Sequence, residues 1–173
     1  SAHPALFETL ADADAPSRRR AQVCRILARS ADSNTAAGLL PHIQDPNPIL
    51  RGSAISALCS IVDARPGQKL DSVTVRKALN HECRLALERR MMEGELALDG
   101  EHGELLVDAI LHARKGCRKR IFGLLAILYP DRQIDLVERN LRSSVVATQS
   151  NALEVLENFL NRDDISIVLP IFD

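Results

Sequence analysis

The sequence contains few aromatic residues and has no excess of either charge. It has no Trp, one Tyr and four Phe among 173 residues, and 23 acidic side chains balance 22 basic ones, for a formal net charge of -1. Proteins that bind single-stranded nucleic acid stack bases on aromatic side chains, and a polyanion is attracted by a positive surface. The composition therefore disfavours a protein whose whole surface binds nucleic acid, and leaves only a local basic patch for that function.

Long apolar runs are also missing. The stretches without charge near residues 52–62 and 121–130 reach only about a dozen residues, whereas a helix that spans a membrane needs roughly 20. We therefore expect no segment of this sequence to cross a membrane.

The four cysteines, Cys24, Cys59, Cys83 and Cys117, lie far apart and form no CxxC pair. We identify no signal peptide, and isolated cysteines at this spacing are typical of proteins in a reducing compartment. We expect buried, reduced thiols and a cytoplasmic location.

The two ends of the sequence suggest a domain of a larger protein. The sequence begins at Ser1 without Met and stops at Asp173, directly after the apolar run ISIVLPIF, which has no following segment to pack against. We expect residues 1–173 to form a single domain that belongs to a longer chain.

Apolar residues recur at the spacing of an α-helix almost throughout. Positions i, i+3, i+4 and i+7 are apolar in one segment after another, and no sustained strand-like alternation is present. Breakers separate the segments in the stretches DPNP, ARPGQ, DGEHG and YPDR, and Asp71 or Ser72, Asp131 and Asp163 are placed to cap helix starts. The sequence predicts helices over residues 4–11, 16–30, 34–44, 48–64, 72–98, 104–128, 133–142, 146–160 and 165–172.

Four of these helices share one apolar pattern. Arg51 is followed at +3, +6, +7 and +10 by Ala54, Ala57, Leu58 and Ile61. The same offsets are apolar after Arg118 (Ile121, Leu124, Leu125, Leu128) and Gln149 (Ala152, Val155, Leu156, Phe159), and the first three after Arg20 (Val23, Ile26, Leu27). The leading residues are 31, 67 and 31 positions apart, which indicates a repeat of about 33 residues with one unit obscured. The middle of the chain is predicted instead to form a hairpin of two longer helices.

The stretch DPNPILRGSAISALCSIVDARPG resembles the HEAT-repeat family. Its matching residues are Asp45, Pro46, Pro48, Arg51, Ala54, Ala57, Leu58 and Ile61. The resemblance implies an all-α fold, an α-α superhelix (solenoid) of antiparallel helix hairpins, which binds another protein along its surface. The helix pattern of this sequence adds a longer central pair to that fold. Gln149, which replaces the basic residue, and the central hairpin depart from the family pattern.

A narrower resemblance begins near Asp45. The order of a HEAT unit, a long hairpin and the segment 124–160 is similar to the HEAT domain of bacterial multidomain proteins with an ATP/ADP-antiporter-like membrane region. This resemblance implies a cytosolic regulatory module beside a nucleotide transporter-like membrane region, often together with a cyclic-nucleotide-binding-like domain. The residues that carry it are Leu124 to Tyr129, Ile134, Leu141, Arg142, Ser143, Asn151, Ala152, Leu153, Glu154, Leu156, Glu157 and Asn158.

No motif for a catalytic or cofactor site is present. The sequence lacks the patterns GxxxxGK[ST], GxGxxG, GxSxG and HExxH, so we expect no enzyme and no cofactor. His81, Cys83, His112 and Cys117 are residue types that zinc binds, but His81 and Cys83 point about 200° apart on a helix. We expect an exposed histidine and two packed thiols there, with no metal. The remaining histidines, His3, His42 and His102, have no partner visible in the sequence.

Acidic pairs and adjacent methionines are weaker signals. Asp163 with Asp164, and Glu154 with Glu157, could act as acid and base only if burial separated their pKa values, so we expect helix-start charges and an exposed face. Met91 and Met92 could form an adaptable partner surface, but a core seam is the commoner place for Met.

Basic residues gather in two places, RRR at 18–20 and a denser group near residue 117. The denser group pairs residues at i and i+4 and suggests a charged stripe that could hold phosphates or another partner. A salt-bridged surface is the favoured interpretation, because Glu82, Glu88, Glu93 and Glu95 lie on the preceding helix. The residues of this candidate interaction stripe are Arg114, Lys115, Arg118, Lys119 and Arg120.

These patterns together predict a non-catalytic HEAT-repeat scaffold that binds a protein, either another domain of the same parent chain or a separate protein. The alternative is a HEAT-like nucleic-acid-binding or DNA-processing protein that uses the basic stripe.

Overall fold

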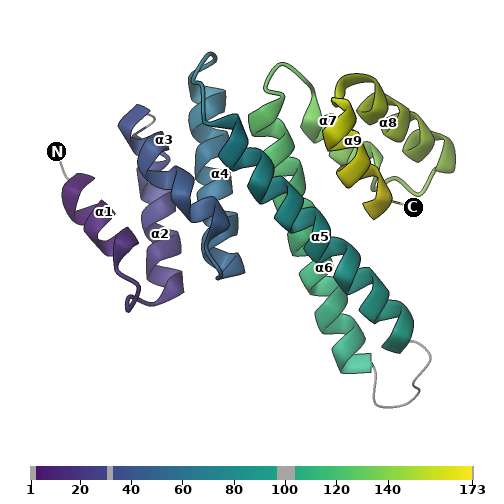
Figure 1. The fold of residues 1–173 in the computed structure, drawn as a ribbon, viewed down its shortest axis with the longest axis horizontal. Helices are drawn as coiled ribbons and strands as arrows, with labels where there is room; N and C mark the ends of the chain where they lie inside the picture. The colour runs from purple at the N-terminus through teal and green to yellow at the C-terminus, as the bar shows by residue number, and fades with distance from the viewer. Residues whose placement is uncertain (1–2, 31–32, 97–103, 173) are drawn as a thin grey trace. The chain divides into compact units, whose positions relative to one another are not determined.

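The computed structural model describes residues 3–30, 33–96 and 104–172, and these residues form helices joined by turns and loops, with no strand among them. Figure 1 shows helices joined by short connections. The elements are α1 (His3–Ala11), α2 (Ser17–Leu27), α3 (Ser33–Leu39), η1 (Leu40–Gln44), α4 (Pro48–Ala64), α5 (Ser72–Leu96), α6 (Glu104–Leu128), α7 (Ile134–Asn140), α8 (Val146–Phe159), α9 (Arg162–Val168) and η2 (Leu169–Ile171). The all-α prediction is confirmed.

Two predicted helices, over 48–64 and 104–128, match α4 and α6 at both ends. Pro48 occupies the first turn of α4, where its missing N–H costs nothing, and the Asn47 side chain accepts hydrogen bonds from the N–H groups of Ile49 and Leu50. At the start of α5, Asp71 accepts from the N–H groups of Val73 and Thr74 at 3.2 Å. The sequence therefore marks these starts with ordinary capping residues.

Other predicted boundaries were wrong, and proline explains two of them. Pro41 turns the predicted helix over 34–44 into α3 followed by the 3-10 helix η1, and Pro170 similarly ends α9 in η2. Helix α9 begins earlier than predicted because Asn161, rather than Asp163, caps it by accepting from the N–H of Asp164 at 2.8 Å. The predicted breaker DGEHG lies outside the described residues.

The chain forms two compact units. The first contains residues 1–78 and 123–130, and the second contains residues 79–122 and 131–173. Helices α5 and α6, with 25 residues each, are the longest described helices and contribute residues to both units. The longer central pair is therefore confirmed, whereas the single domain over 1–173 stays a prediction.

In the first unit, α2 packs against α1 and α4 around an apolar core. Leu27, Leu50, Leu58 and Ile61 are fully buried in this core. The end of α6 also reaches α4, where an added Cβ on Gly123 would lie 2.7 Å from Cγ2 of Ile55. Glycine is thus required for this close approach.

In the second unit, α5 and α6 run side by side in opposite directions (Figure 1), and ion pairs join Glu82 to Arg120 and Glu93 to Arg114. Helix α7 packs against α8. No helix of the described residues is both long and apolar enough to cross a membrane.

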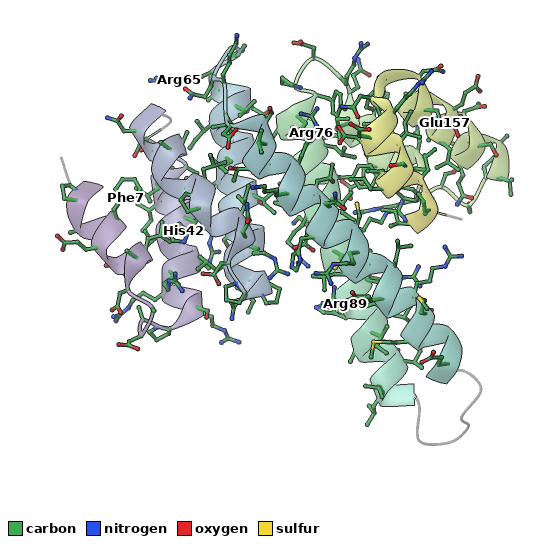
Figure 2. All side chains as sticks on the ribbon, in the orientation of Figure 1. Phe7, His42, Arg65, Arg76, Arg89 and Glu157 are labelled. Atoms are coloured by element: carbon green, nitrogen blue, oxygen red, sulfur yellow. The ribbon has the colours of Figure 1, made fainter. Side chains whose placement is uncertain are left out.

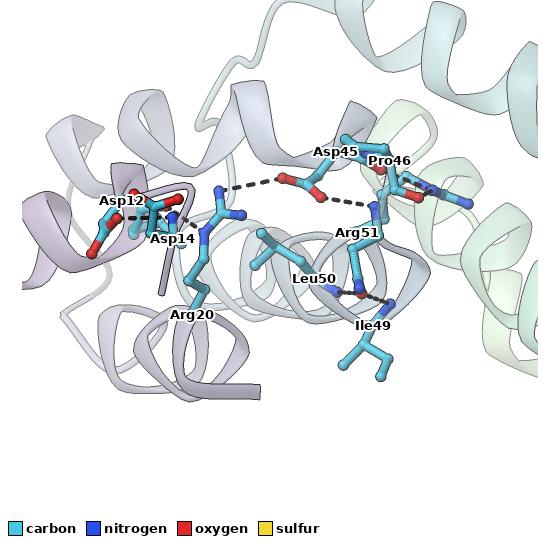
Figure 3. A network of polar contacts seen from close by, with 10 residues as sticks. Asp12, Asp14, Arg20, Asp45, Pro46, Ile49, Leu50 and Arg51 are labelled. Atoms are coloured by element: carbon cyan, nitrogen blue, oxygen red, sulfur yellow. Dashed lines mark hydrogen bonds and ion pairs between the residues drawn. The ribbon is translucent and has the colours of Figure 1, made fainter. Parts of the chain in front are cut away.

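A polar network connects the loop before α4 to two arginines of the first unit (Figure 3). Arg51 donates from Nη1 to the carbonyl oxygens of Asp45 at 2.8 Å and Pro46 at 2.9 Å, and its side chain is buried. Arg20 pairs with the Asp45 carboxylate at 3.3 Å and donates to the carbonyl of Leu10 at 2.9 Å. The arginines that lead two predicted repeats therefore hold the same loop.

The second unit contains a similar arrangement before α8. Gln149 donates from Nε2 to the carbonyl oxygen of Ser143 at 2.7 Å, six residues earlier, as Arg51 donates to Asp45. The Ser143 hydroxyl accepts from the N–H of Val145, as the Asp45 carboxylate accepts from the N–H of Asn47. Gln149 thus makes the contact of a leading arginine without its charge.

Candidate interaction pocket

The five residues of the predicted stripe all lie on α6, but they do not share one surface. Lys115 and Lys119 are exposed, Arg114 and Arg118 are half-buried, and Arg120 is buried. Helix α6 therefore distributes these charges between solvent, a pocket and the seam with α5.

Arg120 lies buried in the seam between α5 and α6, so it is not part of an exposed stripe as predicted. Its Nε lies 2.8 Å from Oε1 of Glu82, which is fully buried, and its Nη2 lies 3.4 Å from Sγ of Cys117. The stripe fails here because Arg120 follows the buried Cys117 by three residues and precedes the buried Leu124 by four. The spacing of Arg120 from these apolar residues in the sequence already indicates that it lies on the apolar face of α6.

The glutamates of α5 take different partners. Glu93 pairs with Arg114 on α6, whereas Glu88 pairs with Arg84 on its own helix. The predicted salt-bridged surface is therefore confirmed for Arg114, while the partner of Arg120 lies in the interior.

Arg118 contacts two neighbouring aromatic rings. The centre of its guanidinium is 5.8 Å from the centroid of the Phe122 ring and 5.2 Å from that of Phe172. The two rings are themselves 6.0 Å apart and tilted, which fixes Phe172 against α6. Burial lowers the pKa of Arg118, and Arg142 adds to this effect, yet a guanidinium stays charged at neutral pH.

A pocket of about 180 Å³ opens beside Arg118. Arg114, Lys115 and Arg118 supply its positive charge, and none of the described acidic residues lines it. Its apolar lining comes from α5, α6 and the segment after α9, namely from Ala86, Leu111, Ile121, Ile171 and Phe172. Arg90 donates to the carbonyl of Pro170 at 3.3 Å and so connects α5 to this last segment. Sequence reasoning missed the pocket because residues distant in sequence form its wall.

The candidate zinc ligands differ in how far they are buried. Cys83 and Cys117 are buried, His112 is exposed, and His81 contacts Arg84. Burial raises the pKa of Cys83 to about 12 and raises that of Cys117 as well. Both thiols are therefore protonated at neutral pH, as packed thiols should be. The described residues contain no group of three or more His, Cys, Asp or Glu placed for a metal ion.

The other histidines are dispersed. His42 (Figure 2) lies in the first unit, where burial and the charge of Arg20 lower its pKa. His102 lies outside the described residues, as does the side chain of His3.

Two minor predictions need correction. Asp164 is buried in the first turn of α9, whereas Asp163, Glu154 and Glu157 are exposed as expected. Met91 and Met92 are 68% and 49% exposed, so their predicted place in a core seam was wrong.

In the RRR cluster, Arg18 and Arg19 are exposed, while Arg20 forms an ion pair with Asp45.

No protein-family model, no characterised protein and no solved structure matches this chain.

Proposed function

We propose that the chain is a non-catalytic helical-repeat module, of the HEAT-like α-α superhelix type, that binds another protein. The observation that carries this proposal is the recurrence of one loop-and-helix geometry. Two contacts among Asp45, Asn47 and Arg51 recur among Ser143, Val145 and Gln149: the backbone N–H that donates to a side chain two residues earlier, and the long side chain that donates to a carbonyl six residues earlier. Each pair is 98 residues apart, about three repeats of 33 residues.

Repeat arrays of this type present a continuous surface on which partners bind. Burial also supports the pattern, because Ala54 and Leu58 on α4 and Ala152 and Leu156 on α8 are buried at the same offsets from the leading residue. The offset +6 differs, since Ala57 is buried whereas Val155 is 46% exposed. Val155 is therefore an apolar side chain on the exposed surface of α8.

The resemblance to transporter-associated HEAT domains supports a more specific proposal, a cytosolic regulatory domain of a nucleotide transporter-like membrane protein. The complete reading frame tests this placement. Several apolar spans of roughly 20 residues beside residues 1–173 would support it, and their absence from the complete frame would overturn it.

Cross-linking of the full-length parent protein, followed by mass spectrometry, tests the interaction function. We expect cross-links from the exposed Lys115 or Lys119 to another domain or another protein. Small-molecule turnover by the parent that is lost when residues inside this chain are changed would overturn the non-catalytic proposal.

A further inference from the structure

We propose that the pocket on α6 binds a protein segment that presents one apolar side chain next to carboxylates. This inference rests on the proposed protein-binding function and specifies the chemistry of the partner. It draws on the charge, the size and the preorganised arginine of the pocket.

The charge of the pocket favours an acidic partner. Lys115 and Arg118 form no ion pair with another residue of the described ranges, and Arg114 alone has an acidic partner, Glu93. The described lining contains no carboxylate. A partner carboxylate would therefore meet positive charge without displacing an acid from the lining.

The size and the wall of the pocket favour a single side chain. Its volume of about 180 Å³ is below the range of roughly 300–1,000 Å³ that is usual for small-molecule sites. Leu111, Ile121 and Phe172 give it an apolar wall, which a phosphate group would leave unused. One apolar residue of a peptide uses both the wall and the volume.

Arg118 is positioned in advance for a carboxylate. Its contacts with Phe122 and Phe172 restrict the side chain, so less conformational entropy is lost on binding. Its Nε and Nη2 are buried and have no hydrogen-bond partner within residues 3–30, 33–96 and 104–172, so Arg118 attracts a partner carboxylate through its charge rather than through these two atoms.

Selection from a displayed library of random peptides against the full chain tests the proposal. We expect enriched peptides that combine one Leu, Ile or Phe with neighbouring Asp or Glu residues. Fluorescence anisotropy with a labelled enriched peptide should show roughly tenfold weaker binding when its acidic residues become Asn or Gln. Replacing its apolar anchor with Ala should weaken binding by a similar factor.

Variants of α6 assign the binding to the pocket. Arg118→Gln and Lys115→Gln should each weaken peptide binding several-fold or more, whereas Lys119→Gln, on the same helix but outside the lining, should not. Lys115 is exposed, so its variant keeps the test valid if Arg118→Gln unfolds the chain; circular dichroism checks the fold of each variant.

The outcomes separate the two proposals. Enriched peptides without acidic residues, or binding that Lys115→Gln and Arg118→Gln leave unchanged, would overturn the pocket assignment and leave the protein-binding function standing. A library that yields no binding peptide, together with a parent protein that gives no cross-links, would overturn both.

Discussion

Glu82 and Arg120 form an ion pair that is almost completely shielded from solvent, with 2.8 Å between Oε1 and Nε. Removing one member of such a pair leaves a buried charge without its counterion. We therefore expect Arg120→Met to lower the free energy of unfolding by about 3–5 kcal/mol. Urea unfolding followed by circular dichroism measures this loss.

The exposed pair of Arg84 and Glu88 provides the control for this prediction. Its members are one helical turn apart on α5 and largely in solvent, so Arg84→Met should cost no more than about 0.5 kcal/mol. Equal losses for the two variants would contradict the buried ion pair.

Gly123→Ala should destabilise the chain by about 1–3 kcal/mol. The new Cβ would lie 2.7 Å from Cγ2 of Ile55, which is buried and has little room to move. Gly94→Ala is the matched control, because this exposed glycine of α5 has open space around it, and the change should stabilise the helix by about 0.5–1 kcal/mol. Thermal unfolding of both variants compares them, and a neutral Gly123→Ala would refute the close packing.

Alkaline pH should destabilise the chain through Cys24. Burial raises the pKa of this thiol from 9.0 to about 11, so the unfolded chain loses its proton at lower pH than the folded chain does. The resulting stabilisation is complete below pH 9 and declines as the pH rises toward 11, by at most about 1.4 kcal/mol per pH unit. Urea unfolding from pH 8 to 10.5 measures the slope.

The variant Cys24→Ala should reduce this alkaline slope by the contribution of one thiol, while the buried Cys83 and Cys117, whose pKa values are also raised, keep part of it. Cys59→Ala serves as the control, since the Cys59 side chain is only half-buried. An unchanged slope in Cys24→Ala would show that the thiol does not contribute.

The nucleic-acid alternative has a direct test on α6. Arg114 and Arg120 already pair with Glu93 and Glu82, so we expect no mobility shift of duplex DNA by the full chain, even at low salt. A shift that disappears when Lys115 and Lys119 are both changed to Gln would reinstate the basic stripe as a nucleic-acid site.

The fold was predictable where local chemistry decides it. Pro48 and the Asn47 cap fix the start of α4, and both residues lie at that start, so the sequence alone reveals them. The burial of Arg120 was predictable as well, since its spacing from Cys117 places it on the apolar face of α6. Charge alone suggested a surface position, but the helical phase decides the environment of a side chain.

The pocket was not predictable from local patterns. Phe172 contacts Arg118 from a position more than 50 residues away in the sequence, and no spacing rule links the two. Exposure of Met91 and Met92 has a similar origin, because the packing of neighbouring segments decides which part of a long helix is covered.

The hydrogen bond of Gln149 to Ser143 bears on the sequence pattern of the proposed repeat. An amide supplies the same directed donor as the guanidinium of Arg51 and carries no charge that must be balanced. A pattern that demands a cation at the fourth position of the helix would exclude α8 from the proposed repeat, whereas one that accepts any long side-chain donor retains it.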